Sequence, residues 1–159
     1  MDKKEALEIV KNDPNEILNL PENFQKDRDV VLESIKNDNG ASMLLADLSF
    51  RHEIFLKDRE IVLEAVKKYG DILIHVDVDK SFLKDKEIVL EALKSSHEWE
   101  GRVSEIMDAI DKSLVNDEDI KYWSSIICIL NEKDMNKMGS GQYEELTNIK
   151  GAIWSRVDE

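Results

Sequence analysis

Hydrophobic and polar positions recur in nearly the same order at several points along the chain. The stretch "FLKDREIVLEAVKKYG", which begins at Phe55, is almost repeated by "FLKDKEIVLEALKSSH", which begins at Phe82. Within the first stretch, apolar residues three and four positions apart form a stripe along one face of a helix: Val62, Ala65, Val66 and Tyr69. Ile61 and Leu63 widen this stripe. The pattern therefore predicts a helix packed between neighbours on two sides.

Three further copies are less exact. One contains "KDRDVVLESIK" after Phe24, and weaker ones are "DKKEALEIVK" from Asp2 and "LVNDEDIKYWSSI" from Leu114. The aspartates that align between the copies are separated by 25, 31, 27 and 32 residues. A period of about 30 residues that varies slightly is typical of stacked helical hairpins. We therefore expect an all-α fold of tandem helical-hairpin repeats, a short α-solenoid-like array.

The expected organisation is a single compact domain. About five hairpin units would occupy residues 1–138, "GSG" at 139–141 would form a flexible joint, and residues 142–159 would form a capping helix at the C-terminal end.

Each aligned aspartate is expected to cap the N-terminus of its helix. An aspartate carboxylate accepts hydrogen bonds from the unpaired amides of the first turn and suits the positive end of the helix dipole. A second acid two residues later strengthens this effect at Asp29, Glu60, Glu87 and Asp119. Gly40 and Gly70 are predicted to end two helices in the left-handed conformation.

The second helix of each unit is predicted to be shorter and more variable. "DPNEILNL" offers Asp13 as a cap and Pro14 at the first helical position, and "ASMLLADL" and "DILIHV" take the same place in the next units. Ser95 and Glu98 have capping-box spacing and predict a longer helix, with an apolar seam of Trp99, Val103, Ile106, Ile110 and Leu114.

Composition and charge agree with a helical, heavily charged exterior. Charged residues make up 36% of the chain, only two prolines and six glycines interrupt it, and the net charge is −13, spread along its length. Such a surface repels nucleic acids and anionic lipids and attracts basic proteins. Solubility alone is the alternative explanation of the acidity.

Candidate chemistry is sparse. His52, His75 and His97 lack the spacing of a metal site, and "DVDKSFLKDKEI" lacks the glycine and the final glutamate of a calcium loop. No phosphate-binding loop is evident, so we expect neither metal nor cofactor and no catalytic residues. His75, Asp77 and Asp79 would form the most plausible acid–base cluster if the protein were an enzyme of unfamiliar type.

The location expected from the sequence is the cytoplasm. Cys128 is alone within "SSIICIL", so no intrachain disulfide can form, and it is expected to be a small core residue. No signal-peptide-like or membrane-spanning apolar run is apparent.

The segments "KDREIVLEAVKKYG", "KDKEIVLEALK" and, more loosely, "KDRDVVLESIKNDNG" resemble a family of short tandem helical repeats from bacteria and some microbial eukaryotes. That family is catalogued as a domain of unknown function. The resemblance covers roughly residues 24–96. It implies all-α repeats but brings no reaction, cofactor or catalytic residue.

The functional expectation is a non-catalytic, acidic protein that binds a basic protein. Its most concrete form is an immunity or inhibitor protein that neutralises a basic cognate toxin such as a nuclease. The residues expected to contact the partner are Glu98, Glu100, Glu105, Asp108 and Asp111. The alternative is a structural adaptor that binds its partners through apolar surface.

Overall fold

The computed structural model describes residues 1–37, 53–96 and 102–130. Every regular element in these ranges is helical, which confirms the predicted all-α class for this part of the chain. The α-helices are α1 (Lys3–Asn12), α2 (Glu22–Gln25), α3 (Arg28–Asn37), α5 (Arg59–Val66), α6 (Ile72–His75), α7 (Lys86–Ser95), α8 (Arg102–Ala109) and α9 (Glu118–Leu130). The 3₁₀ helices are η1 (Pro14–Asn19), η2 (Glu53–Lys57) and η3 (Lys80–Lys84).

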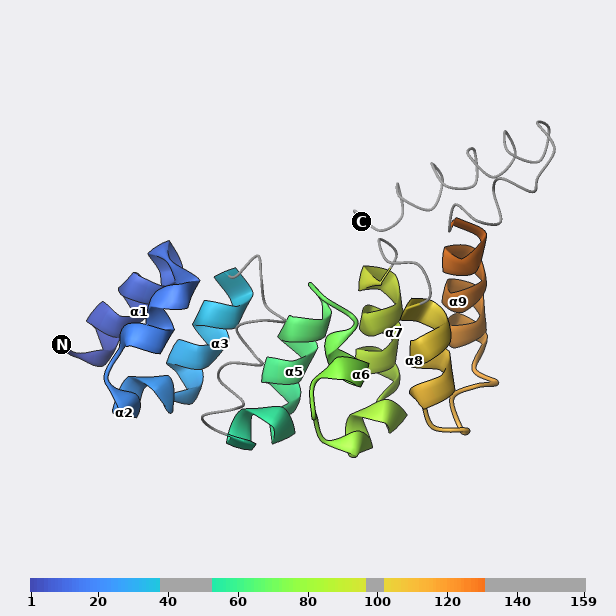
Figure 1. The fold of residues 1–159 in the computed structure, drawn as a ribbon, viewed down its shortest axis with the longest axis horizontal. Coiled ribbons are helices and arrows are strands. Elements are labelled where there is room, and N and C mark those ends of the chain that lie inside the picture. The colour runs from blue at the N-terminus through green and yellow to red at the C-terminus, as the bar shows by residue number, and fades with distance from the viewer. Residues whose placement is uncertain (38–52, 97–101, 131–159) are drawn as a thin grey trace.

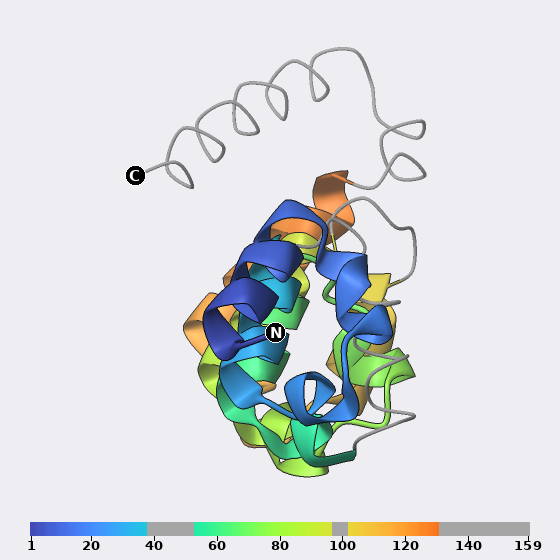
Figure 2. The same ribbon diagram turned by 90° about the vertical axis from the view of Figure 1, so that its left-hand side faces the viewer.

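Five helices lie side by side in one row, and shorter elements form a second row beside it (Figure 1). In the first row, α1, α3, α5, α7 and α9 each contact the next. The second row contains η1, α6 and α8, which pack against the first row and against one another where α6 meets α8. Figure 2, viewed along the row, shows these two layers from the α1 end.

The predicted aspartate caps are confirmed. Asp58 Oδ1 accepts hydrogen bonds from the amides of Glu60 and Ile61 at 3.1 and 3.3 Å. Asp27, Asp85 and Asp117 make the same pair of bonds at the starts of α3, α7 and α9. Asp2 caps α1 through a capping box with Glu5.

The residue that follows each cap reaches across to the next helix of the row. Arg28 places Nε 2.6 Å from Asp58 Oδ2 and Nη2 2.6 Å from Glu60 Oε2. Arg59 repeats this arrangement with Asp85 and Glu87. We call the four such bridges the cap ladder; its cations are Lys3, Arg28, Arg59 and Lys86, and each binds the cap aspartate of the next helix and the acid two residues beyond.

The cap ladder lowers the pKa of the cap aspartates. At Asp85 and Asp117 the largest influence is the hydrogen bond from Arg59 or Lys86, which stabilises the carboxylate. At Asp27 and Asp58 the largest influence is partial burial, which raises the pKa, but the bonds from Lys3 or Arg28 and from backbone amides outweigh it. All four pKa values therefore lie below the ordinary range.

The inner helices bury two adjacent sides, as the widened stripe predicts. The third and fourth residues after each cap have no exposed surface in α3, α5 and α7. These positions hold Val30 and Val31, Ile61 and Val62, and Ile88 and Val89. Burial of several apolar side chains on both sides of a helix is the main source of its stability in the row.

The left-handed conformation predicted for Gly70 is wrong. Its backbone lies outside the left-handed region, and the residue is buried. A Cβ atom at this position would overlap the carbonyl oxygen of Ala92 and Oγ of Ser96 in the neighbouring unit. Glycine is therefore required for close packing between units rather than for a turn. Gly40 lies outside the described residues.

The long helix predicted to start at Ser95 is also wrong. Ser95 is the last residue of α7, and its Oγ donates to the carbonyl of Val66 at 2.5 Å instead of capping a following helix. The next helix, α8, ends at Ala109 because Asp111 starts a turn by accepting from the amide of Ser113 at 3.0 Å. Leu114 therefore lies outside this helix, while Glu98 and Trp99 fall outside the described residues.

The other predicted second helices have mixed outcomes. Asp13 accepts from the amide of Asn15 and Pro14 is the first helical residue, as predicted, but η1 is a 3₁₀ helix. The stretch "DILIHV" contains α6. The stretch "ASMLLADL", the joint at 139–141 and the helix at 142–159 lie outside the described residues.

Substitution of Gly70 by alanine should destabilise the protein. Where the backbone allows it, Gly→Ala stabilises slightly by restricting the unfolded chain, but here the added methyl group overlaps a backbone oxygen that cannot move alone. We expect a net loss of about 1–3 kcal/mol in the free energy of unfolding measured by urea denaturation. Lys121→Ala, at an exposed site, is the control; equal effects of the two changes would contradict this explanation.

Removal of one ladder cation should make stability less dependent on pH. Because the folded-state pKa values of the cap aspartates are lowered, their contribution is fully present above the unfolded value of about 3.9 and is lost as pH falls through the folded values. Arg59→Met should therefore lower the free energy of unfolding at pH 7, and its difference from the unmodified protein should shrink below about pH 4.

The matched control for Arg59→Met is Lys67→Met, which removes an ion pair within one helix, between Lys67 and Glu64. It should have a smaller effect at pH 7. The free energies of unfolding of Arg59→Met and the unmodified protein could instead differ by the same amount from pH 7 to below about pH 4. That result would rule out the cap ladder as the cause of the difference.

Candidate functional site

Most acids of the first row already have a cationic partner. Besides the cap ladder, Glu64 lies 2.7 Å from Lys67, and Glu91 lies 2.7 Å from Lys94. Glu60 is also 3.6 Å from Lys36. The carboxylates on this side of the protein are thus largely neutralised by neighbouring cations.

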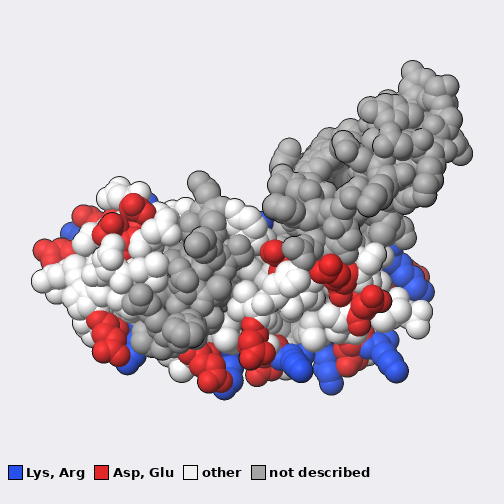
Figure 3. Space-filling model, viewed as in Figure 1, with Lys and Arg blue, Asp and Glu red and all other residues white. Residues whose placement is uncertain are grey.

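The acids of the second row differ. Asp13 and Glu16 lie at η1, Asp71 and Asp77 flank α6, and Asp108 lies on α8. None of these five, which we call the second-row acids, forms an ion pair within residues 1–37, 53–96 and 102–130. Figure 3 shows acidic side chains around α8, whereas acidic and basic side chains alternate along the lower edge. The acidic excess of the described residues is therefore most exposed on the second row.

The structure brings together three of the five residues predicted to contact a partner. Glu105 and Asp108 are exposed on α8, and Asp111 follows that helix. Asp111 is partly engaged, because Lys84 Nζ lies 3.6 Å from its Oδ2 and the amide of Ser113 is the main cause of its lowered pKa. Glu98 and Glu100 lie outside the described residues.

Glu105 also links the two helices of the second row. His75 Nε2, at the end of α6, lies 3.4 Å from Glu105 Oε2 on α8. Both side chains are about half exposed, at 48% and 52%, so this contact does not remove either of them from solvent. It joins the end of α6 to α8.

In the cluster considered for acid–base chemistry, which is His75, Asp77 and Asp79, Asp79 has a structural role. Asp79 accepts from the amide of Ser81 at 2.8 Å and caps η3, and bonds from Ser81 are the main cause of its lowered pKa. Asp77 is exposed. A carboxylate held at a lowered pKa, such as that of Asp79, is not tuned for proton transfer at neutral pH.

Among the described residues, no three His, Cys, Asp or Glu side chains are grouped so that they could hold a metal ion. No helix in that part of the chain is long and apolar enough to cross a membrane. Trp123 on α9 is half-buried, with the ammonium of Lys94 5.5 Å from its ring centre.

Sequence reasoning identified the acidic excess but missed its uneven neutralisation. The sequence contains evidence of this difference, because lysine and arginine are concentrated in the recurring segments that form the first-row helices. The segments "DPNEIL", "DILIHVDVD" and "SEIMDAID" contain no lysine or arginine. The sequence does not show that these segments lie on one side of the protein. That follows from the packing of η1, α6 and α8 against the first row.

Comparison with known proteins gave a match to a family model. A family model described as "Domain of unknown function (DUF4116)" matches residues 2–51 and 58–99. No curated protein and no solved structure gave a match. The two matched segments comprise more than half of the 159 residues, and the chain therefore belongs to this family of unknown function.

Proposed function

We propose that this protein is a non-catalytic, protein-binding array of tandem helical hairpins, in which the second row binds a basic partner. Each hairpin would consist of one first-row helix and the second-row element that follows it. The proposal is supported by the recurring contact of each first-row helix with the next and by the packing of η1, α6 and α8 beside them. Stacked hairpins generate extended surfaces suited to holding another protein.

The observation that carries the proposal is the difference in pairing between the two rows. A carboxylate that already contacts a lysine or arginine has little attraction left for a partner, whereas a solvated, unpaired carboxylate retains its full charge. The second-row acids belong to the latter group. Together with Glu105 they would give a negative potential on one side of the protein, which speeds encounter with a positively charged surface.

The partner that best fits this surface is a basic protein that itself binds an anionic polymer. We therefore propose an immunity or inhibitor role in the cytoplasm, with a basic toxin such as a nuclease as the target. Lysine and arginine side chains that bind phosphates also bind carboxylates. The second-row acids would then occupy the surface that the toxin otherwise uses for nucleic acid.

A structural adaptor is the second candidate, favoured by two exposed apolar side chains. Ile54 in η2 is 61% exposed and Tyr122 on α9 is 50% exposed. An adaptor that binds through such residues would associate with little dependence on salt, because burial of apolar surface is not screened by ions. Salt dependence therefore distinguishes the two candidates.

Charge reversal on α8 should slow binding of a basic partner. The partner is first recovered with the tagged protein from its native cells, and its association rate is then measured at low and high salt. Glu105→Lys combined with Asp108→Lys should reduce the low-salt rate by at least about tenfold, because the attraction that steers the encounter is replaced by repulsion.

The matched control is Glu22→Lys combined with Glu53→Lys. This variant changes the net charge equally, but at exposed positions of α2 and η2 where each acid already pairs with a lysine. It should retain most of the association rate. Recovery of an acidic partner only, or equal slowing by both variants, would refute the proposed binding surface.

A further inference from the structure

The two end helices of the first row carry charges where the other helices carry apolar residues. The third residue after the cap is fully buried in α3, α5, α7 and α9, but in α1 it is Glu5, which is exposed. The fourth residue is fully buried in α1, α3, α5 and α7, but in α9 it is Lys121, which is exposed. Glu5 on α1 and Lys121 on α9 therefore lie on the outer sides of the two end helices. No other first-row helix contacts these sides among the described residues.

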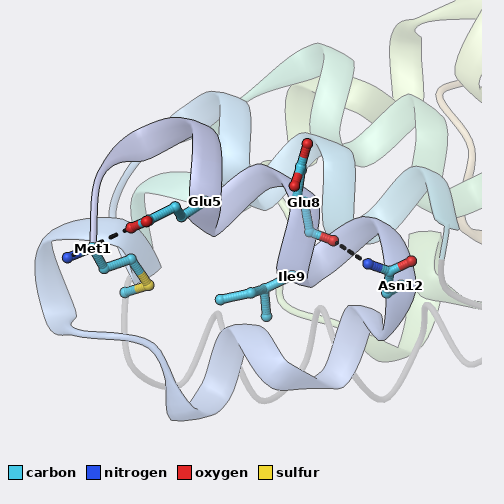
Figure 4. A pocket seen from close by; sticks show the side chains of 5 residues that line it. All are labelled: Met1, Glu5, Glu8, Ile9 and Asn12. Atoms are coloured by element: carbon cyan, nitrogen blue, oxygen red, sulfur yellow. Dashed lines mark hydrogen bonds and ion pairs between the residues drawn. The ribbon is translucent and has the colours of Figure 1, made fainter.

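The side of α1 that carries Glu5 is hollowed. The hollow, of about 470 Å³, is lined by Met1, Glu5, Glu8, Ile9 and Asn12 (Figure 4). Ile9 is the seventh residue after the cap. The same position holds Ser34 in α3, whose Oγ donates to the carbonyl of Pro14 in the preceding unit, and Ala92 in α7, which adjoins Gly70 of the preceding unit. The hollow thus occupies the place where an inner helix meets the segment that follows the preceding first-row helix, such as η1 or the turn at Gly70.

The charges of the cap ladder are inverted at the same two ends. The first residue after the cap is a cation in α1, α3, α5 and α7, but in α9 it is Glu118. The second residue is an acid in α3, α5, α7 and α9, but in α1 it is Lys4. Lys4 and Glu118 are both exposed, and neither has an ion-pair partner in the part of the chain that the structure describes.

We propose that a second copy of this chain packs its α9 against the hollow of α1 and extends the first row head to tail. In the step from one first-row helix to the next, the first residue of a helix contacts the second residue of its successor, as Arg59 contacts Glu87. A step of the same geometry between copies brings Glu118 to Lys4. It also brings the side of α9 that carries Lys121 against the side of α1 that carries Glu5.

The same geometry predicts weak, salt-sensitive association. Glu118 also approaches Asp2, a like charge, and Glu5 already lies 3.6 Å from the N-terminal amine of Met1, so the attraction between copies is partly offset. Apolar contact would come from Met1 on α1 and Tyr122 on α9, which are 54% and 50% exposed. Because the two surfaces differ, the contact does not close on itself after two copies and permits chains of copies.

Sedimentation velocity of the 159-residue chain over a concentration series tests this proposal. The unmodified protein should associate at about 20 mM salt and dissociate at about 500 mM, where exposed charges are screened. Lys4→Glu should raise the dissociation constant at least about fivefold, because Glu118 then faces acids at positions 2 and 4. Glu118→Lys exchanges the attraction to Lys4 for one to Asp2 and should change the dissociation constant less. Lys112→Glu, which makes the same charge change as Lys4→Glu in an exposed turn, should leave it unchanged.

Combining the two changes gives the sharpest comparison. The double variant Lys4→Glu/Glu118→Lys recreates a rung of the cap ladder between copies, so it should associate more strongly than the unmodified protein. An equimolar mixture of the two single variants should also associate, because every contact between unlike copies is then complementary. An unmodified protein that stays monomeric at low salt, or a double variant as weak as Lys4→Glu alone, would overturn the proposal.

Discussion

The aspartate at the start of each first-row helix is the interaction on which the structure depends. Its carboxylate accepts hydrogen bonds from two amides of its own helix and, through the other oxygen, a bond from the cation of the preceding helix, as at Asp58 and Asp85. One side chain thus fixes where a helix begins and how it lies against its neighbour. Because both functions require the same short segment, Asp followed by a cation and an acid, that segment recurs at the starts of α3, α5 and α7.

This arrangement also accounts for the distribution of charge. The cations that follow the caps form ion pairs with the acids of the next helix. Most remaining lysines of the first row form ion pairs with other acids of the first row. The second-row helices η1 and α6 contain no lysine or arginine, and α8 contains only Arg102, at its first position. Among the described residues, unpaired acids therefore lie mainly on the row that is not built from the recurring segment. The proposed binding surface follows from the way in which the first row is held together.

The sequence predicted the parts of the fold that depend on local chemistry. The caps at Asp58 and Asp85 and the buried stripe were predictable because capping and periodicity act within one helix. The cap ladder was not, since it requires knowledge of which helix lies next. The predictions for Gly70 and Ser95 were wrong for the same reason. Each residue type is typical of a helix end, but here Gly70 packs against Ala92 and Ser95 donates to the carbonyl of Val66. Of the predicted contact residues, Glu105 and Asp108 lie on α8, but which of them has an ion-pair partner depended on packing.

A double-mutant cycle between Arg59 and Asp85 tests the central claim most directly. Asp85→Ser retains a side-chain oxygen that can cap α7 but removes the charge that Arg59 binds, and Arg59→Met removes the cation. If the cap aspartate joins neighbouring helices, the two changes together should lower the free energy of unfolding at pH 7 by less than the sum of their separate effects. Strictly additive effects would contradict the account, because the aspartate would then act only within its own helix.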